Sequence, residues 1–354
     1  MTLNFSAKIF LFIIALYAIP SHGDEINKIS SCDSTCMTKL QQALDSTRSK
    51  YNVIGAQMSV SLPSRNGNLR PIRTFYSGHI DSTKNTPMGS INRRGKPINL
   101  MGDGSITKSF TAAIILQLES ENKIKLNDTL GKYLPQYSDW SSVTIRQLLN
   151  MTAGIFDYSN DSTAFEKKLA SNIYQQWSPE ELIKFSYNNT EKSENCPKGG
   201  NTCFAPGAGY YYSNADYILL EMIISKITGH TFEQEIYDRL LGPSSRLGRL
   251  NNTYYVPDTY PAGIALRMVR RYDPTLGDIT FMNMSWAGPA GANISNTADL
   301  VDWARLLFQT REVLPEQQSN MLTQLICADK KILLCLENRF NTQANHALLV
   351  MAWG

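Results

Sequence analysis

The first part of the chain combines one helical pattern with two strand-like runs. Residues 24–50 repeat apolar side chains with helical spacing, whereas residues 53–62 and 72–76 have the pattern of strands joined by a turn. A polar loop that contains glycine then covers residues 77–97. The pattern therefore predicts a helix followed by a β-hairpin.

Helical patterns dominate from Ser105 onward. The segment that begins there carries a broad apolar stripe made of Phe110, Ala113, Ile114, Ile115 and Leu118. Ser178 is followed by proline and two glutamates, which is the pattern of a helix start. Residues 217–227 predict an apolar helix that Gly229 ends, and Thr297 opens a last clear helix.

Strands come first in this order, many helices follow, and we expect the tail to return to the sheet. Such an order predicts an α/β protein of the α+β type, with a large helical region inserted into a sheet domain. We assign residues 24–104 to the first part of the sheet domain, residues 105–290 to the helical region and residues 291–354 to the return to the sheet domain. The chain shows no internal repeat and no low-complexity linker.

The N-terminus has the composition of a secretory signal peptide. Lys8 precedes an apolar run over residues 9–19, and small or turn-forming residues follow before Asp24. The run is too short to favour a spanning helix, although an uncleaved anchor remains the alternative. We therefore predict a signal peptide over residues 1–23, a periplasmic or secreted protein, and no stable membrane span after cleavage.

The cysteines agree with export. The chain has six, and they fall into three local pairs: Cys32 with Cys36, Cys196 with Cys203, and Cys327 with Cys335. An even number of cysteines in a secreted chain indicates disulfide bonds, and pairing between neighbours is the simplest arrangement. Zinc binding is the alternative, but no pair has the spacing of a zinc ribbon.

Composition excludes several classes of function. Hydrophobic residues make up 42% of the chain and charged residues 18%, which is typical of a folded protein with a sizeable core. The net charge of +3 and the lack of a basic run with interleaved aromatics argue against nucleic acid. No phosphate-binding loop and no His-Glu-x-x-His motif occurs, so we expect neither a cofactor nor a metal.

Histidine-dependent serine chemistry is also poorly supported. The Gly-x-Ser-x-Gly motif is absent, and only four histidines occur: His22, His79, His230 and His346. His22 lies in the predicted signal peptide, and His230 follows a helix-ending glycine, where a solvated cap is the simplest interpretation. A nucleophilic serine in this chain therefore needs another base.

Ser105 and Lys108 offer such a pair. They are three residues apart, so a helix places both side chains on one face. Burial lowers the pKa of a lysine and lets it act as a base, and the helix N-terminus favours an oxyanion. Taken alone, the pattern also fits an N-cap serine and a surface lysine.

A second element favours the catalytic interpretation. Tyr212 and Asn214 are two residues apart in a glycine-containing loop that precedes an apolar helix. A tyrosine hydroxyl near a lysine can be partly deprotonated and act as a base, and an asparagine amide can orient a carbonyl and hold the lysine. The alternative for Tyr212 is a packing aromatic in a tyrosine-rich run.

Four stretches together resemble the serine β-lactamases of class C and the D-alanyl-D-alanine carboxypeptidases, the penicillin-binding serine hydrolases. The resemblance covers roughly residues 50–310, in the order of the family. The stretches are GSITKSFTAAIILQLESENKIKLNDTLGKYLPQY, VTIRQLLNMTAGIFDY, FAPGAGYYYSNADYILLEMII and GPAGANISNTADLVDWARLL.

This resemblance implies a fold and a mechanism. The fold would be an antiparallel sheet flanked by helices, with an inserted helical domain. Ser105 would be the nucleophile, Lys108 and Tyr212 would move the proton, and Asn214 would bind substrate. The implied activity is acyl-enzyme formation on D-Ala-D-Ala peptides by a monomer. A β-lactamase acting on β-lactams, an esterase and a catalytically impaired homologue are the alternatives.

The family's third motif is missing from the sequence. We find no Lys or His followed by any residue and then glycine between Asp299 and Gly354, and His346 fails at the glycine. We therefore expect the C-terminal strands to be incomplete, through truncation or a frameshift. In the alternative interpretation, the tail from about Lys330 supplies a strand in an unfamiliar way.

Overall fold

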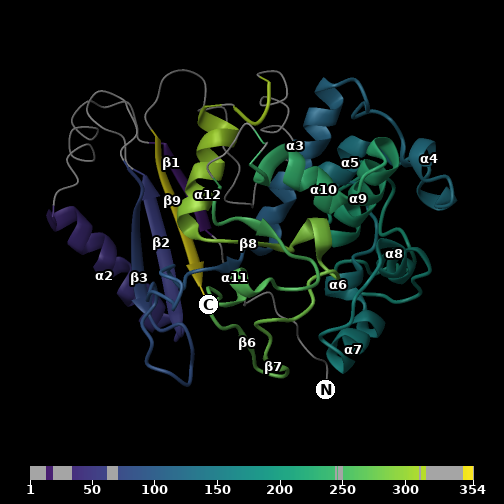
Figure 1. The fold of residues 1–354 in the computed structure, drawn as a ribbon. Coiled ribbons are helices and arrows are strands. Elements are labelled where there is room, and N and C mark those ends of the chain that lie inside the picture. Colours follow the sequence, from purple (N-terminus) through teal and green to yellow (C-terminus); the bar gives the residue numbers. More distant parts are fainter. Residues whose placement is uncertain are drawn as a thin grey trace.

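An antiparallel sheet with a helix on each face stands beside a body made mostly of helices (Figure 1). This mixed architecture confirms the predicted α/β class of the α+β type. The computed structural model describes residues 13–18, 34–61, 71–243, 245, 250–310, 312–315 and 346–353.

The strands form three sheets in this part of the chain. The main sheet has the order β1-β9-β2-β3, a second has the order β4-β8-β5, and β6 pairs with β7. Their bounds are β1 Ile13–Ala18, β2 Gly55–Ser61, β3 Arg73–Gly78, β4 Met101–Gly102, β5 Tyr254–Tyr255, β6 Tyr272–Asp273, β7 Gly277–Asp278, β8 Asn293–Ser295 and β9 His346–Trp353.

The helices are short except for α2, α3 and α9. The α-helices are α2 Ser34–Lys50, α3 Thr107–Ser120, α4 Leu130–Tyr133, α5 Ile145–Leu149, α6 Tyr158–Asp161, α7 Thr163–Ser171, α8 Pro179–Tyr187, α9 Asn214–Thr228, α10 Phe232–Ile236, α11 Ala262–Ala265 and α12 Thr297–Ala304. The 3₁₀ turns are η1 Gly104–Ile106, η2 Ser138–Trp140 and η4 Gly288–Ala290, and the π turns are η3 Tyr237–Leu241 and η5 Arg305–Gln309.

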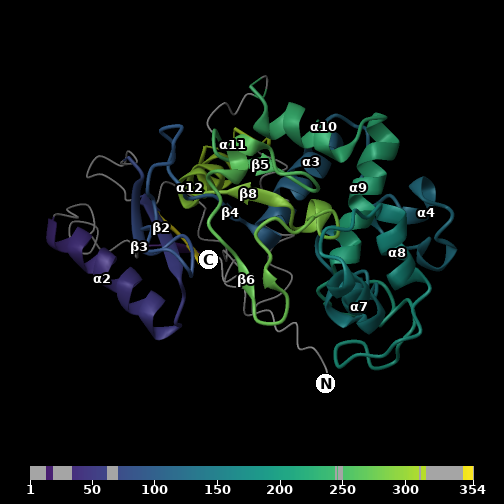
Figure 2. The same ribbon diagram turned by 60° about the horizontal axis from the view of Figure 1, so that its bottom comes forward.

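The predicted helix and hairpin are confirmed within the described residues. β2 and β3 pair antiparallel with Gly55 opposite Gly78 and Val60 opposite Arg73. Every residue of β2 is buried because α2 covers one face of this sheet and α12 packs on the other (Figure 2). A hydrophobic layer therefore lies between α2 and the sheet, formed by Leu44 of α2 and by Ala56, Met58 and Val60 of β2.

The end of the chain supplies a strand to the main sheet. β9 pairs with β2, with Met58 opposite Met351, and with β1, with Leu16 opposite Leu348. His346 begins β9, in agreement with the alternative interpretation of the tail. The residues of β1 belong to the segment that the sequence assigns to a signal peptide. That assignment, like the incompleteness of the C-terminal strands, stays a prediction.

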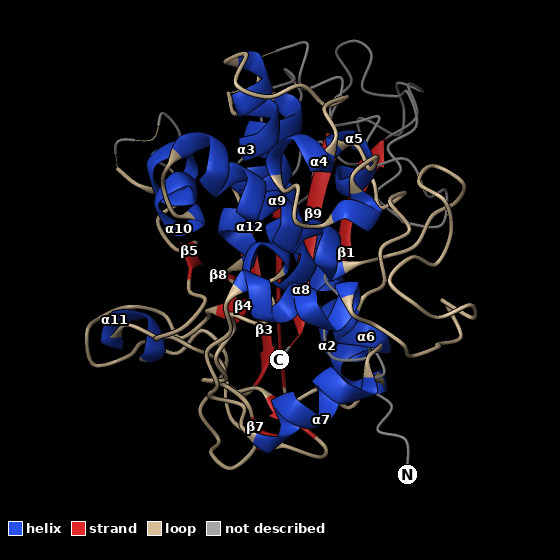
Figure 3. Cartoon of the chain, turned by 90° about the vertical axis from the view of Figure 1, so that its right-hand side faces the viewer, coloured by secondary structure: helices blue, strands red, loops and turns tan. Residues whose placement is uncertain are grey.

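The helical body is built around α3 and α9. Both helices are apolar over most of their surface, and ten of the fourteen residues of α3 are buried because α9, α10 and η4 pack around it. The ring of Phe110 stacks on Trp303 of α12 with centroids 3.8 Å apart. This contact joins α3 to the helix that covers the sheet. Figure 3 shows the body in front of the sheet.

The helix boundaries follow local signals. Ser178 and Glu181 form the predicted capping box at the start of α8, and Gly229 ends α9 with a φ of 75°. α12 begins at Thr297 as predicted, although its capping side chain is Asn296. Among the described residues, no helix combines the length and the apolar composition that crossing a bilayer requires.

Candidate active site

Ser105 lies in a tight turn directly before α3. Gly104 precedes it with a φ of 54°, a left-handed conformation that glycine adopts without strain, and η1 then leads into the helix. The side chain of Ser105 is exposed and makes no capping hydrogen bond to η1 or α3. The N-cap interpretation of Ser105 is therefore wrong.

Lys108 lies one turn further on and points inward. Its side chain is only 6% exposed, so it is not a surface lysine. The ammonium nitrogen Nζ lies 3.1 Å from Ser105 Oγ, 2.6 Å from Asn214 Oδ1 and 2.7 Å from the carbonyl oxygen of Ala290. α3 thus provides the lysine, while α9 and η4 provide two of its acceptors.

Burial lowers the pKa of Lys108 to about 7, because the charged ammonium is removed from water. The carboxyl groups of Asp157 and Asp216 act in the opposite direction. The rings of Tyr212 and Tyr217 lie 4.9 and 5.4 Å from Nζ. A lysine with a pKa near neutrality is partly unprotonated at pH 7 and can accept the proton of Ser105.

Tyr212 completes the contact with the nucleophile. Its hydroxyl lies 2.5 Å from Ser105 Oγ. The backbone on either side of it is fixed, since the N–H of Tyr211 donates to the carbonyl of Met151 and Ser213 is fully buried. Met151 itself has a φ of 58°, which is unusual for a residue other than glycine.

Burial raises the pKa of Tyr212, and the hydrogen bond with Ser105 opposes this only in part. A phenol in this environment keeps its proton at neutral pH. This differs from the sequence-based expectation of a partly deprotonated tyrosine, because that expectation took no account of desolvation. Lys108 is therefore the better proton acceptor, and Tyr212 is placed to pass a proton on.

Asn214 connects the lysine to a second group of polar residues. Its Oδ1 accepts from Lys108, and its Nδ2 donates to Ser159 Oγ over 2.6 Å. Ser159 Oγ in turn donates to Asp157 Oδ1 over 2.8 Å. The structure thus brings Ser105, Lys108, Tyr212 and Asn214 together, as the sequence predicted, and extends the network to Ser159 and Asp157.

Three buried carboxyl groups near this network were missed by the sequence analysis. Asp103, Asp157 and Asp216 are each at most 1% exposed. Burial raises the pKa of Asp103 to about 8 and raises those of Asp157 and Asp216. Neither oxygen of Asp216 has a hydrogen-bond partner among the described residues. For Asp216 the sequence did contain a signal, because an aspartate within an apolar helical run is unusual and indicates a buried carboxyl group.

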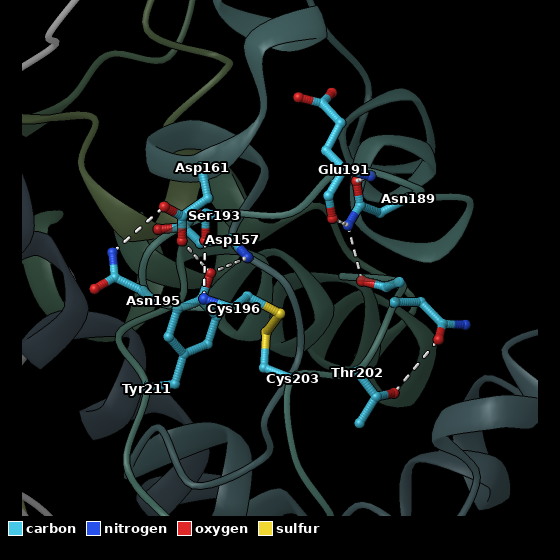
Figure 4. The surroundings of a disulfide bond; sticks show 12 residues. Asp157, Asp161, Asn189, Glu191, Ser193, Asn195, Cys196, Thr202, Cys203 and Tyr211 are labelled. Atoms are coloured by element: carbon cyan, nitrogen blue, oxygen red, sulfur yellow. Dashed lines mark hydrogen bonds between the residues drawn. A yellow bond between two sulfur atoms is a disulfide. The ribbon is translucent and has the colours of Figure 1, made fainter. Parts of the chain in front are cut away.

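One predicted disulfide bond is confirmed. Cys196 and Cys203 are joined by a disulfide bond (Figure 4). They pack with Phe156 and Tyr211 in a small apolar cluster. Tyr211 precedes Tyr212, and its hydroxyl donates to Asp161 and accepts from the N–H of Asp157. The disulfide therefore packs on the two residues that directly precede Asp157 and Tyr212.

The other cysteines are only partly described. Cys36 is disulfide-bonded, but Cys32, its predicted partner, lies outside the described residues. Cys327 and Cys335 also lie outside them, so their pairing stays a prediction. No group of three or more metal-binding side chains of His, Cys, Asp or Glu occurs in the part of the chain that the structure describes.

His230 takes no part in the network around Ser105 that the structure describes. It is exposed, and its Nδ1 lies 2.7 Å from Glu235 Oε1. This agrees with its interpretation as a solvated residue beyond the end of α9.

A serine with a desolvated lysine and a tyrosine within hydrogen-bond distance of its hydroxyl can carry out acyl transfer without a histidine. The family model described as Beta-lactamase matches residues 97–329, about two thirds of the chain. The chain belongs to this family of β-lactamases and penicillin-binding serine hydrolases. The matched range includes all four predicted site residues.

Relatives and solved structures agree with this assignment. Penicillin-binding protein 4* of Bacillus subtilis is 28% identical over 47% of this chain and 35% of its own length. D-aminopeptidase of Brucella canis is 25% identical over 58% of this chain and 36% of its own length. A D-stereospecific amidohydrolase from a Streptomyces species is 28% identical, with a TM-score of 0.63 over 80% of this chain and 76% of the other.

The chain spans less than half of the length of the curated relatives that it matches, with 40%, 42% and 35% for three of them.

Proposed function

We propose that the protein hydrolyses amide bonds next to D-configured residues through an acyl-enzyme on Ser105, with peptides ending in D-Ala-D-Ala as the first substrate class. The observation that carries the proposal is the position of Lys108. Its buried Nζ lies 3.1 Å from Ser105 Oγ and has a pKa of about 7. A neutral amine at this distance can accept the serine proton without a histidine.

The proposed reaction has two halves. Ser105 Oγ attacks the carbonyl carbon while its proton passes to Lys108 Nζ, and the tetrahedral intermediate collapses as the leaving amine takes up a proton through the hydroxyl of Tyr212. This leaves an ester between the substrate acyl group and Ser105. Water then attacks the ester, its proton passes to the same groups, and Ser105 is released.

Two relatives support the choice of D-configured substrates. A D-aminopeptidase and a D-stereospecific amidohydrolase share at least 25% identity with the chain. The similarity to penicillin-binding protein 4* supports penicillin as a ligand of the site, and D-Ala-D-Ala peptides come first because the sequence resembles the D-alanyl-D-alanine carboxypeptidases. The Cys196–Cys203 disulfide supports the further proposal that the protein works in the periplasm or outside the cell.

The test uses covalent labelling with a fluorescent penicillin and turnover of matched peptides. We expect a labelled band for the wild type and none for Ser105→Ala. We also expect hydrolysis of a peptide ending in D-Ala-D-Ala and none of its L-Ala-L-Ala counterpart. Ser120→Ala is the matched control, since Ser120 lies at the other end of α3 and is exposed.

The outcomes separate the alternatives. Rapid turnover of a chromogenic cephalosporin without peptide hydrolysis would assign the protein to the β-lactamases instead. If the folded wild type takes up no label and cleaves neither peptide, the proposed function is wrong.

A further inference from the structure

Asn214 is held from two sides by hydrogen bonds of opposite direction. Its Oδ1 accepts from Lys108 Nζ over 2.6 Å, and its Nδ2 donates to Ser159 Oγ over 2.6 Å. A side-chain amide has one end that accepts and one end that donates. Rotation of the amide by half a turn would bring its NH₂ group against the lysine, where two donors would meet.

The direction of the second hydrogen bond is set by a carboxyl group. Ser159 Oγ donates its hydrogen to Asp157 Oδ1 over 2.8 Å. With its hydrogen engaged there, the serine oxygen presents only lone pairs to Asn214. A chain of four side chains therefore runs from Lys108 through Asn214 and Ser159 to Asp157, and each member has only one arrangement that satisfies its neighbours.

Asp157 is itself fixed in the interior. It is fully buried, its Oδ1 also accepts from the N–H of Ser159 over 3.0 Å, and its Oδ2 accepts from the side chain of Asn160. Its own backbone N–H donates to the hydroxyl of Tyr211 over 3.1 Å. The segment that holds Asn214 is thereby also tied to the residue before Tyr212.

We propose that Ser159 and Asp157 are positioning residues that hold the amide of Asn214 in the orientation that places Lys108 against Ser105. The proposal rests on the proposed nucleophile and base, and names two further residues through which the same site works. Neither residue contacts Ser105 or Lys108 through a described hydrogen bond. Ser159 therefore acts through Asn214, whereas Asp157 also acts on Lys108 directly through its charge.

A purely structural role is the competing explanation. Asp157 accepts from the N–H of Ser159 as the N-cap of α6, and a cap stabilises a helix without affecting catalysis. Ser159→Ala separates the two roles, since it removes the hydroxyl that Asn214 needs and keeps the backbone N–H that the cap needs.

The test measures the rate at which Ser105 reacts with a dye-labelled alkyl fluorophosphonate. In this reaction, the serine oxygen bonds to phosphorus, fluoride leaves, and the serine proton passes to Lys108. The probe requires an activated serine but no D-configured acyl group. We expect Ser159→Ala to react about 10-fold more slowly than the wild type, as for the loss of one hydrogen bond.

Two control variants keep the comparison specific. Ser159→Thr retains the hydroxyl, so we expect it to react within about threefold of the wild type. Ser171→Ala, at the exposed end of α7, removes a hydroxyl that lies outside this network, and we expect a similarly small change.

A double-mutant cycle gives the decisive comparison. If Ser159 acts through Asn214, the change Ser159→Ala has no further effect in an Asn214→Ala background. The proposal is overturned if Ser159→Ala reacts at the wild-type rate, or if it slows both backgrounds by the same factor. A wild type that reacts with the phosphonate but with neither penicillin nor D-peptides would overturn the substrate class and leave this inference standing.

Discussion

Lys108 shows how the environment of a single side chain decides its chemistry. The residue carries the same amine as a surface lysine, but it is 6% exposed and its pKa falls to about 7. The sequence indicated this residue through its spacing from Ser105. It could not give the burial, because the atoms that cover the amine come from α9 and η4, more than 100 residues away.

The pKa of Lys108 predicts how the rate of phosphonate labelling depends on pH. Ser105 needs the neutral amine, so the rate of phosphonate labelling should rise with pH through about 7 and level off above it, with a loss of about tenfold per unit below. A rise centred near 10 in the wild type would contradict a desolvated lysine.

At the scale of the element, the segments that precede α6 and α9 pack on the same disulfide bond. The disulfide between Cys196 and Cys203 packs on Phe156 and Tyr211, each next to a residue of the polar network. Local sequence signals predicted α8, α9 and the pairing of these cysteines. They did not predict that the pair supports the candidate site, because Phe156 lies 40 residues before Cys196.

Removal of this disulfide should destabilise the protein. For the double change Cys196→Ala and Cys203→Ala, we expect the free energy of unfolding to fall by about 2–3 kcal/mol, since the short loop no longer restricts the unfolded chain. The measurement is denaturant unfolding under oxidising conditions. Ser120→Ala, at an exposed position of α3, is the control and should change the free energy of unfolding by less than about 0.5 kcal/mol. An unchanged free energy of unfolding would show that the bond contributes nothing.

For the whole molecule, the contact between the sheet and the neighbouring segments is partly polar. Ser59 of β2 shares a hydrogen bond of 2.7 Å with Thr297 of α12, and Gln57 donates to the carbonyl of Asn99 over 2.8 Å. Gln57 and Ser59 are fully buried. The sequence predicted a strand over these residues. Because the strand is buried along its whole length, the alternation of polar and apolar residues could not show which groups its polar side chains contact.

Gln57→Met tests this contact. The substitution keeps the shape of the side chain but leaves the carbonyl of Asn99 without its donor, so we expect the free energy of unfolding to fall by about 1–3 kcal/mol. Gln234→Met, on the exposed surface of α10, is the control and should change stability by less than about 0.5 kcal/mol. Equal effects at both positions would contradict the role of Gln57.

The sequence by itself predicted four residues of the candidate site and the helices that begin near Ser105, Ser178, Tyr217 and Thr297. Ser105, Lys108, Tyr212 and Asn214 could be found because short motifs and helical periodicity are local properties of the chain. Only the tertiary structure decided the protonation of Lys108 and Tyr212, the three buried aspartates, and the link from Asn214 through Ser159 to Asp157. These properties depend on which distant segments exclude water from a group and which supply its hydrogen-bond partners, and both follow from packing.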